Sequence, residues 1–226
     1  MADRNAAVRK YLTEMIGTFV FMFAVLGIVL SGTDCVAAVA LGIGSVLMVM
    51  VYASGHISGG HLNPAVSVAA YLRGALPLND LGPYIVAQLA GALAAFGVGF
   101  GLWHDKYAAE TLDLSGAVWP AFLAELVFTF ALCYVVLHTA TSKDSAGNSF
   151  YGLAIGFVVT VGVVAVGAIS GGAFNPAITF GLMLSGIFAW KFLWVYVIAQ
   201  VLGAVVAAYA YKATTLDEHT TASRRG

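Results

Sequence analysis

GHISGGHLNPA, at residues 55–65, returns 112 positions later as GAISGGAFNPA, at residues 167–177. The neighbouring sequence keeps this spacing, because YIVAQLAG at 84–91 recurs as YVIAQVLG at 196–203. Upstream of the two copies, Glu14 and Glu125 stand 111 residues apart. The chain therefore carries one half-protein twice, with repeat 1 at about residues 8–104 and repeat 2 at about residues 118–213.

Composition points to a membrane protein. Hydrophobic residues make up 61% of the 226 residues, and charged residues only 9%. The predicted fold is an all-α membrane protein of one domain, residues 1–226, with a disordered tail at 214–226. Helices of about 20 apolar residues cross a hydrocarbon core of ~30 Å. We expect such spans at Tyr11–Leu30, Val36–Ser54, Pro83–Trp103, Trp119–Thr141, Tyr151–Ile169 and Phe192–Tyr211.

The basic residues predict the orientation of the spans. If the N-terminus is inside, only Lys106 and Lys191 face outward, which agrees with the positive-inside rule and leaves both termini cytoplasmic. Each repeat contains three spans, an odd number, so the second half lies inverted relative to the first. The basic residues expected on the cytoplasmic side are Arg4, Arg9, Lys10, Arg73, Lys143, Lys212, Arg224 and Arg225.

The repeated motif predicts two short helices that enter the membrane from opposite faces. Each Asn-Pro-Ala precedes a ten-residue apolar run, and ten helical residues rise about 15 Å, half a bilayer. Asn is a favoured cap, and Pro is tolerated in the first helical turn. We expect a central pore constriction at Asn63, Pro64, Ala65, Asn175, Pro176 and Ala177. The loop backbone that lines the pore is expected at Gly59, Gly60, His61, Gly171 and Gly172.

With these motifs the chain resembles the aquaporin and aquaglyceroporin (major intrinsic protein) family over essentially its full length. The resemblance rests on both Asn-Pro-Ala boxes, both Ser-Gly-Gly approaches, the two glutamates within spans, and Gln88 and Gln200. It implies six spans plus two re-entrant half-helices in an inverted 3+3 repeat, one pore per protomer, and a homotetramer. It also implies that Glu14 and Glu125 act as loop scaffolds, whereas the alternative for a carboxyl group in a span is a proton relay.

The pore centre should pass neutral solutes and hinder ions. The N-terminal ends of both half-helices carry partial positive charge and meet at the midplane. Asn63 and Asn175 offer amide donors there to a hydroxylated solute, while cations meet an electrostatic barrier. His56 and His61 flank the glycines of the first loop, and we expect structural hydrogen bonds from them in preference to metal ligation.

The selectivity filter is where this chain departs from the family pattern. Four positions build the family's outer filter, and alignment on the Asn-Pro-Ala boxes places them at Ile43, Val163, Gly172 and Ile178. Water-selective relatives usually carry an aromatic residue, a His and an Arg among them, and the Arg follows the second Asn-Pro-Ala, where this chain has Ile178. The expected filter is wide and apolar. A narrow apolar segment does not replace the hydrogen bonds of water, so water permeation should be modest.

The filter residues favour small neutral solutes, but they are compatible with more than one such solute. The chain resembles a subset of bacterial family members that lack the filter Arg and are associated with arsenic resistance. That resemblance favours arsenous acid, and methylated arsenicals beside it, in a bacterial inner (plasma) membrane. The alternative is a generic aquaglyceroporin for water, glycerol, urea, ammonia or hydrogen peroxide. We expect the lipid bilayer as a partner, and neither a nucleic acid nor a cofactor.

Other classes of protein predict different residues. A structural membrane protein with a closed pore predicts occluding aromatic residues at the filter, where this chain has Gly172 and Val163. An ion-coupled transporter needs ionisable residues at mid-depth, and only Glu14 and Glu125 qualify. The sequence contains no evident nucleophile–base pair or metal-ligand spacing, so an enzyme is not expected.

Overall fold

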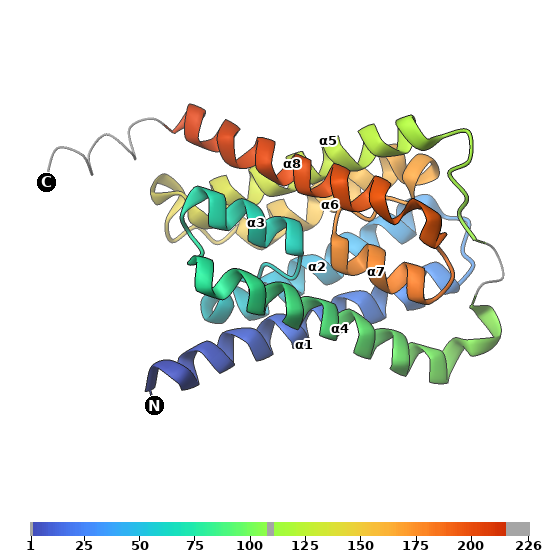
Figure 1. The fold of residues 1–226 in the computed structure, drawn as a ribbon, viewed down its shortest axis with the longest axis horizontal. Coiled ribbons are helices and arrows are strands. Elements are labelled where there is room, and N and C mark those ends of the chain that lie inside the picture. The colour runs from blue at the N-terminus through green and yellow to red at the C-terminus, as the bar shows by residue number, and fades with distance from the viewer. Residues whose placement is uncertain (1, 108–110, 216–226) are drawn as a thin grey trace, which may run out of the picture.

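The computed structural model describes residues 2–107 and 111–215, and the fold within these residues is all-α (Figure 1). Six helices have the length and apolar character of membrane spans, as predicted. The predicted tail at 214–226 falls almost entirely outside the described residues. The α-helices are α1 (Ala2–Leu30), α2 (Val36–Ser58), α3 (Pro64–Arg73), α4 (Leu78–Trp103), α5 (Val118–Val136), α6 (Tyr151–Ser170), α7 (Pro176–Leu184) and α8 (Leu193–Thr214).

Several helix ends differ from the predicted bounds, and the largest difference is at α1, which begins at Ala2 and not at Tyr11. Helix α4 begins at Leu78 and not at Pro83, which lies inside it and lacks the N–H that would donate to the carbonyl of Asn79. Helix α2 continues to Ser58, where Gly59 at φ 90° ends it in the left-handed conformation. The fourth predicted span is α5 followed by a π-helical segment, Leu137–Thr141.

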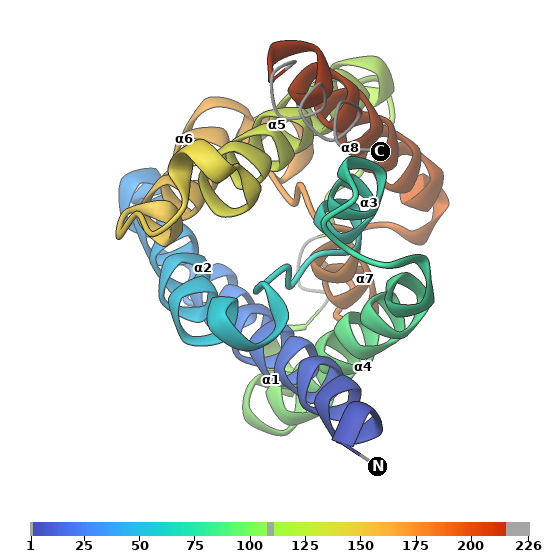
Figure 2. The same ribbon diagram turned by 90° about the vertical axis from the view of Figure 1, so that its left-hand side faces the viewer.

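The repeat is visible in how the helices pair. Helix α1 packs along α4, and their counterparts α5 and α8 pack in the same way, while α2 packs against α6 between the two halves. Viewed along the bundle, α3 and α7 lie one behind the other between α8 and α4 (Figure 2). The short helices therefore complete the wall of the bundle between these two long helices.

Glycines permit the closest helix contacts at equivalent places in the two halves. A Cβ atom at Gly203 of α8 would lie 2.7 Å from the carbonyl oxygen of Leu126 on α5. Gly91 of α4 meets the carbonyl of Met15 on α1 in the same way. Small residues at such crossings let two backbones approach, which is how helices gain packing energy where lipid removes the hydrophobic driving force.

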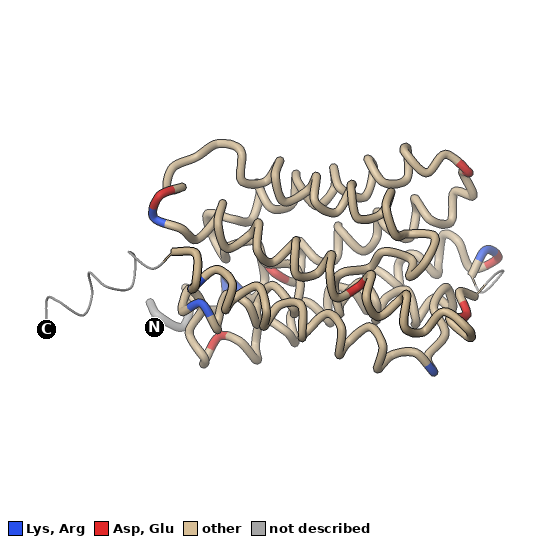
Figure 3. The backbone as a smooth tube through the Cα atoms, turned by 90° about the horizontal axis from the view of Figure 1, so that it is seen from above, with Lys and Arg blue, Asp and Glu red and all other residues tan. Residues whose placement is uncertain are grey.

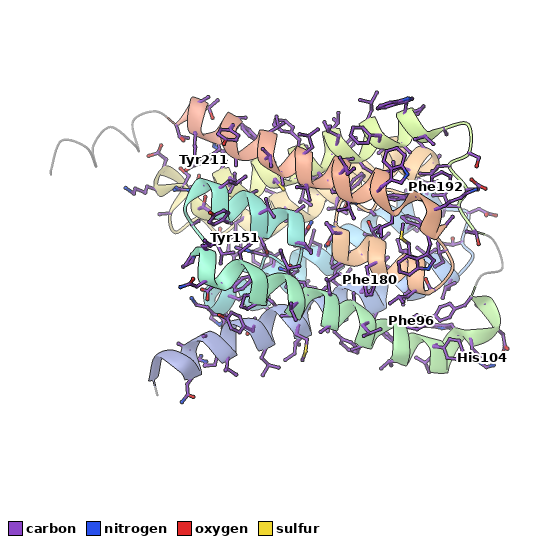
Figure 4. The ribbon with its side chains drawn as sticks, in the orientation of Figure 1. Phe96, His104, Tyr151, Phe180, Phe192 and Tyr211 are labelled. Atoms are coloured by element: carbon purple, nitrogen blue, oxygen red, sulfur yellow. The ribbon has the colours of Figure 1, made fainter. Side chains whose placement is uncertain are left out.

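Charge and aromatic side chains mark the two ends of the bundle. The described Lys and Arg residues lie at the ends, and acidic residues also occur in the middle (Figure 3). Tyr151 and Tyr211 lie towards the end where α1 begins and α8 finishes, and Phe192 lies towards the opposite end (Figure 4). The lateral surface is apolar, with Val86 and Trp119 among the exposed residues. This distribution suits a helix bundle surrounded by lipid.

Two segments are tied together at the end of the bundle opposite the termini. The N–H of Leu112 donates to the carbonyl of Ile187 at 2.8 Å, and Lys191 donates to the Asp113 carboxylate at 2.8 Å. The hydrogen bond from Lys191, together with donors from Ser115, lowers the pKa of the Asp113 carboxyl to about 2. The ion pair of Lys191 and Asp113 therefore remains charged at neutral pH. Together with the backbone bond to Ile187 it fixes Leu112, which lines a cavity of the bundle.

Candidate pore and selectivity filter

Both short helices begin at an Asn-Pro pair, as the sequence predicted. The side-chain oxygen of Asn63 accepts from the N–H of Ala65 at 2.8 Å, and that of Asn175 accepts from the N–H of Ala177 at 2.9 Å. Each asparagine therefore caps its own helix through its oxygen. The amide nitrogen of each side chain remains available as a donor.

The two loops are bonded to each other through these amide nitrogens. Asn63 donates to the carbonyl of Phe174 at 3.0 Å, and Asn175 donates to the carbonyl of Leu62 at 2.9 Å. An amide nitrogen carries two N–H groups, so one is used to join the loops and one is left for a solute. Because the protein bonds both the oxygen and the nitrogen of the amide, each side chain holds a fixed orientation at the pore centre.

Glu14 holds the first loop from inside the bundle. It is fully buried, and it accepts from the backbone N–H groups of His61 at 3.0 Å and Leu62 at 2.7 Å. It also accepts from the hydroxyl of Ser58 at 2.6 Å and the amide of Gln88 at 2.8 Å. Leu62 has a φ of 51°, which costs energy in a residue with a branched side chain. The carboxyl group thus stabilises a strained turn.

Glu125 makes the same set of contacts to the second loop. It accepts from the N–H groups of Ala173 at 3.0 Å and Phe174 at 2.8 Å, and from Ser170 and Gln200, each at 2.8 Å. Phe174 repeats the positive φ, at 49°. These contacts are those of the scaffold role that the resemblance implied, and each carboxyl oxygen is occupied by donors from its own repeat.

Two cavities follow each other along the bundle. The central cavity has a volume of only about 10 Å³, close to the minimum that one water molecule occupies. The outer cavity has a volume of about 190 Å³ and opens beyond it. The central cavity is lined by Phe21, Leu47, Gly60, His61, Asn63, Val66, Leu132, Val136, Ile155, Val159, Ala173 and Asn175. The outer cavity is lined by Phe21, Val25, Val29, Ile43, Leu112, Val159, Gly171, Gly172, Ala173, Ile178, Leu182, Ile187 and Phe188.

The structure brings most predicted filter residues together. Ile43, Gly172 and Ile178 all line the outer cavity, although they come from α2, the second loop and α7. Val163 is not among the residues that line the two cavities. It packs behind Gly172, where its Cγ2 atom would lie 3.3 Å from a Cβ added to that glycine. Val159, one helical turn earlier, faces both cavities in its place.

The predicted constriction divides into lining and supporting residues. Asn63 and Asn175 line the central cavity, together with Gly60 and His61. Gly59 lies at the mouth of the pore on the side of the termini, in a separate cavity that His56 also lines. The remaining predicted residues support the helix starts and line neither of the two cavities: Pro64, Ala65, Pro176 and Ala177.

The side chain of His61 borders the pore and is held by a hydrogen bond to Ser67. Its Nδ1 atom lies 3.1 Å from the hydroxyl of Ser67, and its ring borders the central cavity. Among the residues that the structure describes, no cluster of three His, Cys, Asp or Glu side chains could hold a metal ion.

Several lining residues were not identified from the sequence. Phe21, Val25 and Val29 line the outer cavity from α1, and their spacing of four places them on one helix face. That spacing was a usable signal, but residues 19–30 of α1 are apolar on all sides, so the sequence did not distinguish the pore-facing side of the helix from the lipid-facing side. Leu112 follows a polar segment, and no local pattern pointed to it.

Two buried carboxyl groups, two facing half-helices and a narrow path between them define an aquaporin-type membrane channel for small solutes. The chain belongs to the major intrinsic protein family, whose family model matches residues 1–211. Members of this family are channels and not enzymes. The protein is accordingly an integral membrane protein.

Individual relatives agree with this assignment. The chain is 37% identical to Aquaporin NIP1-1 of Zea mays over 213 residues, covering 90% of this chain and 74% of that protein. It is 33% identical to Nodulin-26 of Glycine max over 212 residues, covering 90% and 76%. Its fold matches the X-ray structure of the aquaglyceroporin from Plasmodium falciparum with a TM-score of 0.76 at 26% identity, covering 91% and 95%.

Replacing Asn175 by Asp tests the ion barrier at the pore centre. A carboxylate placed where two half-helix N-termini meet offsets their positive potential, so we expect cation conductance to rise by about tenfold or more. The measurement is cation leak in proteoliposomes. Asn175→Ala, which removes the bond to Leu62 without adding charge, and exposed Asn79→Asp are the controls. Equal leak in Asn175→Asp and wild type would contradict the barrier.

Proposed function

We propose that this protein is a passive channel for small neutral hydroxylated solutes. Its preferred substrate is arsenous acid, and methylated arsenicals are further substrates. One observation carries the proposal. Among the described residues, those that line the outer cavity are all glycine or apolar, and the position after the second Asn-Pro-Ala is Ile178. A solute therefore meets no fixed charge before it reaches the asparagine pair.

The physical chemistry of the path favours a neutral solute larger than water. No Arg side chain reduces the width of the outer cavity. The described residues that line it have apolar side chains or none, so they offer polar groups only from the backbone, such as the carbonyls of Gly171 and Gly172. A compact solute with several hydroxyl groups can turn its less polar side towards the apolar lining of the cavity. Its hydroxyl groups meanwhile keep some hydrogen bonds to the backbone carbonyls. Water loses more of its bonds per molecule in such a segment, so we infer modest water permeation.

The setting of the channel is part of the same proposal. Lys106 and Lys191 lie at one end of the bundle and the other described basic residues at the opposite end, which supports cytoplasmic termini. Family resemblance supports a homotetramer with one pore in each protomer, and a bacterial plasma membrane. The curated relatives named above come from Zea mays and Glycine max, so the membrane of origin rests on the resemblance alone.

A generic aquaglyceroporin is the second candidate, favoured by the fold match to the Plasmodium falciparum protein. Uptake into proteoliposomes separates the two. We expect arsenite and glycerol to enter at least about tenfold faster than into empty liposomes, and water to show a smaller ratio. Glycerol uptake without arsenite uptake would refute the arsenical assignment and support the generic channel. Uptake of neither solute would refute the channel proposal itself.

A further inference from the structure

The two cavities meet at only three side chains. Phe21 of α1, Val159 of α6 and Ala173 of the second loop line both the central and the outer cavity. We call them the outer ring. Each is buried, with 3%, 4% and 7% of its surface exposed, respectively. A solute that moves from the outer cavity to the asparagine pair passes along these three side chains.

The internal repeat places an equivalent ring on the other side of the asparagine pair. Leu132, Leu47 and His61 stand at the positions that the spacings of 111 and 112 residues relate to the outer ring. All three line the central cavity. We call them the inner ring. The two rings therefore flank the asparagine pair at related positions, which makes the outer ring a recurrent element of the architecture and not a chance contact.

The rings differ in one respect that bears on selectivity. His61 gives the inner ring a polar imidazole bonded to Ser67, whereas the outer ring has Ala173 at the same place. The backbone of Ala173 is fixed by the bond from its N–H to Glu125 at 3.0 Å. All three side chains of the outer ring are thus apolar. Ala173 cannot move without breaking the hydrogen bond between its N–H and Glu125.

The two cavities differ in volume. The outer cavity, which contains Ile43, Gly172 and Ile178, holds about 190 Å³, while the central cavity beyond the outer ring holds about 10 Å³. Three of the four family filter positions thus line the cavity of larger volume. The fourth, Val163, packs behind Gly172.

We propose that the outer ring of Phe21, Val159 and Ala173 sets the upper size limit for solutes, one helical turn deeper than the family filter. This inference rests on the proposed channel function. The apolar ring admits a solute only after most of its water has been removed, and its bulkiest member, the phenyl ring of Phe21, fixes the free cross-section. The filter positions then act as a wide entrance, and their lack of charge decides which solutes enter.

A polyol series in proteoliposomes tests this limit. We would compare water, glycerol, erythritol and ribitol, which differ by one hydroxylated carbon at each step after glycerol. Widening the ring by Val159→Ala or Phe21→Leu should raise erythritol flux relative to glycerol about tenfold, since a methylene or two in an apolar site changes discrimination by that order. Narrowing it by Val159→Phe should lower glycerol flux by a similar factor.

Matched variants separate the ring from other effects. Val161→Phe adds the same ring on the same helix at an exposed position, and Phe23→Leu changes α1 at a residue that packs on Trp103 outside the pore. Both should keep the wild-type polyol ratios. Ile178→Ala widens the entrance, and it should raise the ratio of erythritol to glycerol flux much less than Val159→Ala does.

The outcomes are distinguishable. If Ile178→Ala raises erythritol flux and Val159→Ala does not, the size limit lies at the family filter and the inference is wrong. If the wild-type protein conducts glycerol but no ring variant changes the ratios, the inference fails while the channel function stands. If wild-type protein conducts neither glycerol nor arsenite, the proposed function fails first. Thermal unfolding of each purified variant confirms that a changed flux comes from folded protein.

Discussion

Ile178→Arg is expected to lower arsenite and glycerol flux by at least about tenfold and to raise the selectivity for water over both solutes. Ile178 is buried in the first turn of α7 and lines the outer cavity. A guanidinium group there would occupy much of the space that a glycerol-sized solute needs. It would also supply donors that replace hydrogen bonds lost by water. The measurement is the rate of solute and water entry into proteoliposomes.

The control for this substitution is Ile178→Met, which keeps an apolar side chain of similar volume. It should conduct arsenite and glycerol within about twofold of wild type, since volume-conserving apolar changes are well tolerated. Unchanged arsenite flux in Ile178→Arg would show that the residue after the second Asn-Pro-Ala does not control entry. That result would remove the main support for an arsenical substrate.

Glu125→Gln is expected to destabilise the folded protein, with a thermal midpoint lower by about 10 °C or more. Four donors converge on this buried carboxyl group, from Ala173, Phe174, Ser170 and Gln200. An amide can accept through its oxygen only, and its NH₂ group would face donors. Each buried group left without a partner costs about 1–3 kcal/mol, and the left-handed turn at Phe174 would lose its support.

Thermal unfolding in detergent and recovery of folded protein after extraction measure this effect. Asp105→Asn is the matched control, since it also neutralises a carboxylate but at a side chain that is 86% exposed. It should unfold at the wild-type temperature. The proton-relay alternative predicts the opposite pattern, in which Glu125→Gln folds normally and only a pH-dependent flux is lost. A wild-type midpoint in this variant would therefore support the relay and refute the scaffold.

Much of the architecture was accessible from the sequence because its signals are local or periodic. Apolar stretches of membrane length predicted the six long helices, and the structure confirms the all-α fold. The start of α4 was placed late at Pro83, since a proline near a helix start resembles the start itself. The filter positions closest to the second motif, Gly172 and Ile178, follow from counting three residues in each direction from Asn175.

The residues that line the path from the long helices were harder to identify. A span in lipid is apolar both where it faces lipid and where it faces an apolar pore, so periodicity does not separate the two faces. Phe21 and Val159 were missed for this reason. Val163 was placed at the filter by counting, but its side chain packs against Gly172 and is not among the residues that line the two cavities. The rotation of a helix about its axis depends on its neighbours and not on its own sequence.

The amino-acid sequence alone determined the duplicated half, the two capped half-helices and the absence of an Arg after the second Asn-Pro-Ala. These are matters of local order along the chain, where spacing, proline and asparagine act through short-range backbone geometry. The tertiary structure alone decided that the asparagine amides join the two loops, and that Phe21, Val159 and Ala173 line both cavities. Both depend on segments more than 100 residues apart meeting at one depth, and only packing brings them there.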